Sequence, residues 1–368
     1  MTVAQKIKIA VLGAGRGGPA MVADLTLKGF EVNLFDLPQF EMNLSGIQER
    51  GGIEVTGLFE DFVRPNMVTA NIKEAIENVD LIMLTTAAMG HKAHIDACAP
   101  YLKSGQIIVV NTGYFAALRF GNTMRETLKE VTLAEYTLLP YVCRRLGPAR
   151  VIIDAVKQEL PVAAYPASRT AKVVDVLKAV YPQTVAAASV LETSFNNLNP
   201  IFHPAIALLN AGHAEQTKGD FLFYGEGVTP SVGRIIDAVD EERMAVAEIL
   251  GIKVPSAMEW MVKLYGKYGA RGSSAYEVFQ TCEAHKTVRY PMDSIGSFSL
   301  FAEDLPYGLI PIVSLGNMLD IPTPTISSIV ELSSMATGID YWSEGTTVEE
   351  LGLANLTAQE IKEKIGGD

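Results

Sequence analysis

The sequence has few cysteines, few charged residues and no long apolar run. Its three cysteines, Cys98, Cys143 and Cys282, are odd in number and far apart. No CxxC or Cys/His cluster has zinc-ligand spacing, which argues against a disulfide scaffold or a structural metal. No stretch approaches the roughly 18 apolar residues of a transmembrane helix. The opening MTVAQKIKIAVLGAG lacks a signal-peptide pattern, so we expect a cytoplasmic protein.

Positive charge is also scarce. The 368 residues include 30 Lys and Arg against 42 Asp and Glu, a formal net charge of −12. Nucleic acids and anionic membranes bind through basic patches, so neither is an expected partner. Hydrophobic residues make up 48% of the chain and charged residues 20%, which favours well-buried cores over disorder. The length suits two domains of about 150–200 residues each.

The first half of the chain alternates apolar runs with amphipathic segments, which is typical of βαβ units around a parallel sheet. The strands are predicted at 7–12, 31–35, 81–85, 107–111 and 132–137, and the helices between them at 19–28, 72–78, 91–102 and 116–130. A further strand, helix and strand, at 151–155, 168–181 and 184–188, is predicted to extend the sheet. The glycine-rich segment 51–66 has little periodicity and is predicted to be a loop.

From about residue 190 onward the sequence predicts helices only. They are expected at 194–212, 231–250, 256–265, 275–282, 305–319 and 325–337, with two short terminal helices after them. We therefore predict an N-terminal Rossmann-type parallel α/β sheet over residues 1–190, followed by an all-α C-terminal domain over residues 191–368.

A dinucleotide-binding motif follows the first predicted strand. Gly13 permits the tight turn, Gly15 lets the backbone approach a pyrophosphate, and Gly18 allows close packing of helix on strand. Pro19 then opens a helix, whose N-terminus attracts the diphosphate. The predicted cofactor-binding turn comprises Gly13, Ala14, Gly15, Arg16, Gly17 and Gly18. The alternative for such a motif is a glycine-rich turn without a ligand.

Asp36 ends the second predicted strand, at the position where a carboxylate accepts hydrogen bonds from the ribose hydroxyls of the cofactor. It would repel a 2′-phosphate, and no Arg or Lys follows it directly, so NAD(H) is favoured while NADP(H) stays open. Thr86 and Asn111 follow two further strands and are candidate cofactor contacts, because ligands bind at the carboxyl ends of parallel strands. His91 and His94 lack a third ligand, so no metal is predicted.

The helical half contains the segment SFNNLNPIFHPAIALLNAG. At helical spacing, His203 shares one side with Asn196, Asn199 and Asn210, although two prolines complicate a straight helix. A histidine among amides is either a general acid/base or a hydrogen-bonded core residue. Asp304 precedes a predicted helix and is either its N-cap or a carboxylate that orients an imidazole.

Several stretches carry a resemblance to a known family. They are VLGAGRGGPA, the NxNxxxHP pattern from Asn197 to Pro204, GEGVTPSVG at 225–233, VPSAMEW at 254–260, EDLPYGLIPI from Glu303 and IPTPTI at 321–326. The chain resembles the octopine/nopaline dehydrogenases, the opine dehydrogenases, and particularly their bacterial N-(1-D-carboxyethyl)-L-norvaline dehydrogenase branch. The resemblance implies a C-terminal domain like that of 6-phosphogluconate dehydrogenase.

The resemblance also implies a reaction. Members condense an α-keto acid, by family habit pyruvate, with the amine of an amino acid and reduce the resulting imine with NAD(P)H. The family's catalytic histidine falls on His203 and its partner aspartate on Asp304, which would favour the protonated imidazole. Asn199 and Arg144 are candidate partners of the substrate carboxylates, although Arg144 could equally form a structural ion pair. The family includes monomers and dimers, and we expect a homodimer.

Two alternatives remain at this point. A reductase of the β-hydroxyacid or ketopantoate type shares both kinds of domain but relies on a lysine early on the long helix. This chain has Asn199 and His203 there, and its first lysine beyond them is Lys218. A non-catalytic NAD-sensing protein is the second alternative. The presence of both His203 and Asp304 argues against it, because a sensor needs no proton donor.

Overall fold

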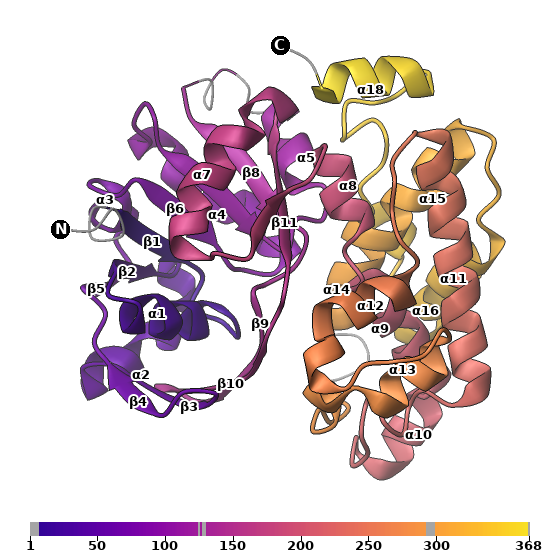
Figure 1. Ribbon diagram of the computed structural model, residues 1–368, viewed down its shortest axis with the longest axis horizontal. Helices are drawn as coiled ribbons and strands as arrows, with labels where there is room; N and C mark the ends of the chain where they lie inside the picture. Colours follow the sequence, from indigo (N-terminus) through magenta and orange to yellow (C-terminus); the bar gives the residue numbers. More distant parts are fainter. Residues whose placement is uncertain (1–6, 124–125, 127–129, 292–298, 367–368) are drawn as a thin grey trace. The chain divides into compact units, whose positions relative to one another are not determined.

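The computed structural model describes residues 7–123, 126, 130–291 and 299–366. The chain folds into two compact units that part after Val190 (Figure 1). The first unit is an α/β structure and the second is helical, so the predicted fold class is confirmed. No helix in the described part of the chain is long and apolar enough to cross a membrane.

The first unit is built on an eight-stranded sheet of order β12-β11-β8-β7-β6-β1-β2-β5. Six strands are parallel in Rossmann order, namely β5 (Met67–Thr69), β2 (Glu31–Phe35), β1 (Lys8–Leu12), β6 (Leu81–Leu84), β7 (Ile107–Asn111) and β8 (Thr132–Tyr136). The order in which strands are added to the sheet reverses at β1: β2 and β5 are added on one side of it, and β6, β7 and β8 on the other. Sheets of this kind bind dinucleotides at such a switch point. Next, β11 (Leu160–Tyr165) pairs antiparallel with β8, and β12 (Thr184–Ala186) pairs parallel with β11.

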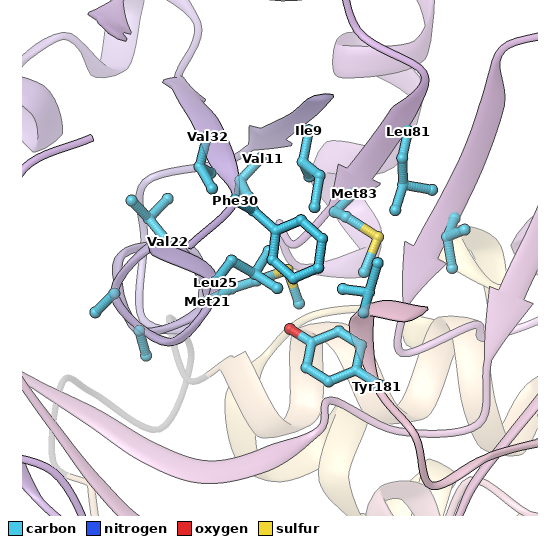
Figure 2. Packing of buried hydrophobic residues seen from close by; sticks show 14 of the residues in the cluster. Ile9, Val11, Met21, Val22, Leu25, Phe30, Val32, Leu81, Met83 and Tyr181 are labelled. Carbon is cyan, nitrogen blue, oxygen red and sulfur yellow. The ribbon is translucent and has the colours of Figure 1, made fainter. Parts of the chain in front are cut away.

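Helices cover the sheet because its strands are apolar on both faces. Ile9 and Val11 of β1 belong to a buried cluster with the apolar side of α1 (Gly18–Leu27), and Figure 2 shows this packing. Ala10 and Leu12, which point to the opposite face, are also buried. The other helices of this unit are α2 (Met42–Arg50), α3 (Ile72–Ile76), α4 (His91–Cys98), α5 (Ala116–Thr123) and α7 (Thr170–Val180). The predicted helix 116–130 extends past Thr123 into residues that lie partly outside the described ranges.

A second, four-stranded sheet has the order β4-β3-β10-β9 and corrects two predictions. Segment 51–66 is not a loop, because it contains β3 (Ile53–Gly57) and β4 (Asp61–Val63). The predicted strand 151–155 lies in β10 (Arg150–Val156), which pairs with β3 and with β9 (Tyr141–Gly147) and not with the large sheet. The unit that extends the large sheet is β11–α7–β12.

In the second unit, every described regular element is helical apart from an isolated bridge between Leu222 and Arg289. Its helices are α8 (Val190–Phe195), α9 (Asn199–Leu209), α10 (Ala211–Thr217), α11 (Pro230–Ile249), α12 (Ala257–Tyr265), α13 (Ala275–Thr281), α14 (Ser299–Asp304), α15 (Ile310–Met318), α16 (Pro324–Thr337), α17 (Tyr341–Glu344) and α18 (Ala358–Gly366). The long helix α11 packs against α9, α13, α15 and α16. Its fully buried Arg243 pairs with Asp240 and donates to the carbonyls of Phe195 and Pro255, which ties three segments together.

The helix predicted to begin at residue 305 is instead a continuation of α14. A π-turn, η8 (Leu305–Leu309), joins it to α15, and the Ile310 N–H donates to the Leu305 carbonyl five residues back. The N-cap alternative for Asp304 is therefore wrong, because Asp304 is the last residue of α14 and makes no side-chain cap. Pro306 lacks a backbone donor, which favours such an irregular turn, and π-turns frequently mark functional positions.

Candidate active site

The glycine-rich turn connects β1 to α1. Gly13 has φ +103°, a conformation that side chains disfavour, and a Cβ there would lie 3.0 Å from the Thr86 backbone nitrogen. A Cβ on Gly18 would lie 1.8 Å from the Gly13 carbonyl oxygen, so α1 reaches the strand only through glycine. Gly15 has no atom within 4 Å of its Cβ position and is exposed together with Arg16. The exposed part of the turn thus leaves room for a diphosphate.

Asp36 lies directly after β2 and holds the turn. Its Oδ2 accepts hydrogen bonds from the Ala14 N–H and the Asn43 amide, both at 3.0 Å, and its Oδ1 accepts one from the Leu37 N–H at 2.9 Å. Burial raises the pKa of Asp36, but these bonds and His94 outweigh it, so the net pKa lies below its ordinary value. A carboxylate offers about four acceptor positions. The three backbone and amide hydrogen bonds take three of these positions, and His94 lies near Oδ1 at 3.4 Å.

Arg145, which sequence reasoning missed, lies beside this acid. It projects from β9, and its Nη1 donates to the Ala14 carbonyl at 2.7 Å, while its Nη2 donates to the Asn43 and Pro148 carbonyls at 2.9 and 2.7 Å. Burial lowers the pKa of Arg145, and the charge of Asp36 raises it. No local pattern indicates this pairing, because Arg145 and Ala14 are 131 positions apart.

The ends of β6 and β7 supply the other predicted cofactor contacts. The Thr85 hydroxyl donates to the carbonyls of Leu12 and Gly13, which places its neighbour Thr86 against the glycine-rich turn. Asn111 is buried, its amide donates to the Leu84 and Val109 carbonyls, and its Oδ1 has no partner among the residues that the structure describes. A buried amide oxygen without a partner is costly, which fits a ligand donor at this point.

The segment after Asn111 is strained. Three non-glycine residues, Thr112, Tyr114 and Phe115, have φ values of 72°, 46° and 58°. Such conformations cluster at ligand-binding positions. Glu135, fully buried on β8, accepts from the Ala117 N–H at 2.9 Å and packs against Gly113, where a Cβ would lie 2.4 Å from its carboxyl carbon. The strain and the buried acid together mark this turn as part of the candidate cofactor site.

His91 and His94 lie on the first turn of α4. Burial, followed by the charge of Arg119, lowers the pKa of His91 to about 3, so this imidazole is neutral near neutral pH. His94 Nδ1 donates to the Gly90 carbonyl at 2.9 Å, and its Nε2 lies 3.4 Å from Asp36 Oδ1. Within the described ranges, no three His, Cys, Asp or Glu side chains are placed to hold a metal.

The second unit brings His203 and Asp304 together. His203 lies in the middle of α9, and its Nδ1 is 2.9 Å from Oδ2 of Asp304 at the end of α14. Since a carboxylate only accepts, Nδ1 carries a proton. The side chain of Asp304 is 1% exposed and that of His203 is 14% exposed, so a buried acid orients an imidazole whose edge is still accessible. This arrangement is that of an acid/base pair.

Tyr224 completes this group and was not identified from the sequence. Its hydroxyl lies 2.8 Å from His203 Nε2, so both nitrogens of the imidazole have a partner. Burial, followed by the charges of Asp304 and Cys282, raises the pKa of Tyr224 well above its ordinary value. The GEGV segment just after Tyr224 belongs to the family motifs, but nothing in the local sequence indicated that this hydroxyl meets His203.

The two candidate substrate contacts have different surroundings. Asn199 is the first residue of α9, and its backbone N–H donates to the Asn197 side chain at 3.2 Å. Nearby, Oδ1 of Asn196 and Nδ2 of Asn197 are buried without a partner in the described part of the chain. Arg144 lies on β9 in the first unit, where its Nη2 is 3.1 Å from Asp154 Oδ2. The structural ion pair left open for Arg144 is thus formed.

Comparison with known proteins bears on the family. Residues 186–337 match the model of the NAD/NADP octopine/nopaline dehydrogenase alpha-helical domain. An opine dehydrogenase of Arthrobacter sp. (strain 1C) is 35% identical over 359 residues, which span 97% of this chain and 98% of that protein. The chain belongs to the opine dehydrogenase family. The resemblance inferred from the motifs is therefore confirmed.

More distant members agree in extent and fold. The Protein ocs of Agrobacterium tumefaciens (strain Ach5) is 25% identical over 98% of this chain and 99% of its own length. A structure of octopine dehydrogenase with NADH and L-arginine superposes with a TM-score of 0.78, covers 99% of both chains and is 19% identical, which shows a common fold. As an opine dehydrogenase, the chain is an NAD(P)-dependent oxidoreductase that acts on CH–NH bonds and joins a keto acid to an amino acid by reductive condensation.

Proposed function

We propose that this opine dehydrogenase reduces the imine that forms between an α-keto acid and an amino acid. Pyruvate is the preferred keto acid, and NADH is favoured over NADPH as the cofactor. The observation that carries the proposal is the 2.9 Å contact between His203 Nδ1 and Asp304 Oδ2. Reductive condensation needs a proton donor at the substrate nitrogen or oxygen, and a histidine beside a buried carboxylate supplies one near neutral pH.

The catalytic roles divide between the two residues of this pair. Asp304 accepts a hydrogen bond from the Nδ1–H of His203 and fixes the orientation of the ring. His203 gives a proton toward the substrate from its Nε2 side and recovers it in the reverse reaction. The hydrogen bond between Asp304 and His203 is shielded from solvent, because only 1% of the Asp304 side chain is exposed. A buried charge-assisted bond of this kind is stronger than an exposed one.

The cofactor end of the proposal rests on the glycine-rich turn. NADH supplies the hydride when it is bound. Asp36 accepts a ribose hydroxyl, Gly15 and Arg16 face the diphosphate, and the helix α1 presents its N-terminus to it. The remaining contacts proposed are Gly13, Ala14, Gly17, Gly18, Thr86 and Asn111. The open space at Gly15 and the partnerless Asn111 Oδ1 support this assignment.

The substrate carboxylates need polar or cationic partners in an acidic protein. We propose Asn199 as one partner, since it opens the helix that carries His203. Arg144 remains the second, because a guanidinium has five donors and 38% of its side chain is exposed beside Asp154. We also propose that the protein is a homodimer and acts in the cytoplasm.

The test is an NADH-oxidation screen of the purified protein. Pyruvate, oxaloacetate and 2-oxoglutarate are each paired with the common amino acids, and each keto acid is also assayed alone. We expect NADH oxidation only when both substrates are present, and a secondary amine as the product by mass spectrometry. Turnover with a keto acid alone would instead identify a hydroxyacid-forming reductase, and tight NADH binding without turnover across the whole screen would indicate a sensor.

Variants assign the role of the histidine. His203→Asn is expected to lower kcat about 10³-fold, since general acid catalysis contributes roughly 10²–10⁴-fold. The exposed His213 provides a matched control in the same unit, and His213→Asn should retain full activity. Near-full turnover of His203→Asn, with an unchanged circular dichroism spectrum, would overturn the assignment.

A further inference from the structure

Both nitrogens of the His203 imidazole are occupied. Nδ1 faces Asp304 at 2.9 Å and Nε2 faces the Tyr224 hydroxyl at 2.8 Å. The Nδ1–H donates its hydrogen bond to the carboxylate, so the nitrogen able to exchange a proton with a substrate is Nε2. That nitrogen already has Tyr224 as its partner. A proton that leaves His203 must therefore displace Tyr224 or pass through its hydroxyl.

The ring of Tyr224 is held too firmly for easy displacement. It stacks on Phe279 with centroids 4.9 Å apart and planes at 14°, and Phe223 packs edge-on at 4.9 Å and 86°. His285 approaches a further side at 4.8 Å. The backbone is fixed as well, since the Val228 N–H donates to the Tyr224 carbonyl at 3.2 Å. The ring is packed on several sides, but its O–H can still turn about the C–O bond.

We propose that Tyr224 is the proton relay between His203 and the substrate nitrogen. A phenol hydroxyl both donates and accepts, so it can take a proton from Nε2 while it gives up its own. In the resting state with a neutral imidazole, Tyr224 donates to Nε2. With a protonated imidazole, Nε2 donates to the Tyr224 oxygen, and the phenol hydrogen turns outward to the imine.

In this transfer, each bond to hydrogen that breaks is matched by one that forms. The Nε2–H bond breaks as a new O–H bond forms on Tyr224, and the original O–H bond breaks as the lone pair of the imine nitrogen takes its proton. His203 ends neutral, with its Nδ1 proton still donated to Asp304, and the reducing electron pair comes from NADH. Burial keeps the pKa of Tyr224 far above neutral, so the phenol passes a proton without ionising.

Other titratable groups around the relay are not placed to replace it. Asp304 lies on the far nitrogen of His203, and the charge of Cys282 raises the pKa of Tyr224, whose own charge in turn raises the pKa of Tyr265. His285 meets Tyr224 and Tyr265 by ring contacts at 4.8 Å. Tyr224 is the group in this cluster for which a hydrogen bond to Nε2 is found.

The proposal rests on the proposed function, and its test uses the whole enzyme with NADH, pyruvate and the best amino acid from the screen. Tyr224→Phe keeps the ring and removes only the hydroxyl. We expect kcat to fall roughly 100-fold, while the KM values stay within about threefold of the wild type. The dependence of kcat on pH should also differ from that of the wild type on its basic side. When kcat is measured in mixtures of H₂O and D₂O, its dependence on the D₂O fraction should indicate two transferred protons for the wild type and one for the variant.

The matched control is Tyr290→Phe. Tyr290 packs against Phe223 at 5.6 Å in the same aromatic cluster, but its hydroxyl donates to the Ala207 carbonyl at 3.0 Å and not to His203. This variant should keep the wild-type pH profile and the two-proton curve. If Tyr290→Phe loses as much activity as Tyr224→Phe, the loss is one of packing and the relay is refuted.

The outcomes separate the relay from the function beneath it. If Tyr224→Phe retains turnover and the pH profile while His203→Asn is inactive, the relay is wrong and the function stands. A linear, one-proton curve for the wild type also overturns the relay, even if the variant does not fold. If no pair of keto acid and amino acid supports NADH oxidation by the wild type, the proposed function itself is wrong and the relay is refuted with it.

Discussion

At the scale of single residues, two opposite charges meet at the cofactor end. Asp36 and Arg145 both bond to Ala14, the former to its N–H and the latter to its carbonyl. The acid disfavours a 2′-phosphate, whereas the guanidinium suits one. The preference between NADH and NADPH therefore depends on which charge dominates near the ribose.

Removing the acid should shift this balance. In Asp36→Ser, we expect kcat/KM for NADPH to rise roughly tenfold and that for NADH to fall by a similar factor, about 1.4 kcal/mol each. Steady-state kinetics with both cofactors measures the ratio. Glu31→Ser, which removes an exposed acid from the strand that precedes Asp36, serves as the control and should leave the ratio unchanged. A fall with both cofactors would mean that Asp36 only holds the turn.

His91 makes the first unit sensitive to acid. Burial lowers its pKa to about 3 in the folded chain, from an ordinary 6.5. Between these values the unfolded chain binds a proton that the folded chain does not, so the free energy of unfolding falls as the pH falls from 6.5 toward 3. The slope reaches about 1.4 kcal/mol per pH unit for one such group.

The prediction concerns the difference between wild type and His91→Asn, which cannot titrate there. Urea unfolding at several pH values should show the wild type losing stability relative to the variant below about pH 6. His213→Asn, at an exposed site, should run parallel to the wild type. Parallel curves for wild type and His91→Asn would show that His91 is protonated without cost.

At the scale of elements, two glycines of one turn do different work. A Cβ at Gly18 would come within 1.8 Å of the Gly13 carbonyl oxygen, whereas one at Gly15 meets nothing within 4 Å. Gly18→Ala must push α1 off β1 and should lower the free energy of unfolding by about 3 kcal/mol. Gly15→Ala should unfold at the wild-type temperature but bind NADH at least roughly tenfold more weakly, because its methyl group enters the diphosphate space.

Thermal unfolding and NADH fluorescence titration separate the two effects. Each variant controls for the other, since both add one methyl group to the same turn. If Gly15→Ala bound NADH like the wild type, the diphosphate would not lie over Gly15. If Gly18→Ala unfolded at the wild-type temperature, the helix would be free to shift.

Most strands of the large sheet and α11 could be predicted because their apolar patterns are regular, whereas β5 and β11 of the same sheet were missed. The strands 31–35 and 107–111 match β2 and β7 residue for residue. The second sheet was missed because β4 has only three residues and β9 carries two arginines and is mostly half-buried, so neither presents a buried apolar run, while the alternation in β3 covers only four residues of a glycine-rich segment. The π-turn at Leu305–Leu309 was read as a helix start, since Pro306 in a first turn gives the same sequence signal.

The candidate site was only partly predictable for a related reason. The glycines and Asp36 lie in one local motif, so their spacing alone indicates them. His203 and Asp304 are 101 positions apart, and only the family resemblance joined them. Tyr224 and Arg145 reach their partners through tertiary packing, which local patterns do not record.

At the scale of the whole molecule, the proposed cofactor contacts and the proposed catalytic pair belong to different units. The contacts of Asp36 with Ala14, Leu37 and Asn43 lie before Val190, and the contact of Asp304 with His203 lies after it. Groups that share no partner usually contribute additively to measured free energies. Binding of NADH and chemical turnover should thus be separable by substitution.

The double variant Asp36→Ser/Asp304→Asn tests this separation. Asp304→Asn alone should lower kcat about 10³-fold and keep the NADH Kd within about twofold, since the imidazole loses the carboxylate that orients it. Asp36→Ser alone should raise the NADH Kd roughly tenfold, with kcat at saturating NADH nearly unchanged. The double variant should then combine the Kd of one with the kcat of the other, within about 0.5 kcal/mol. Fluorescence titration and saturating kinetics give the two constants. A coupling above about 1 kcal/mol would show that the ribose acid and the catalytic pair depend on each other, and the division of labour between the units would have to be abandoned.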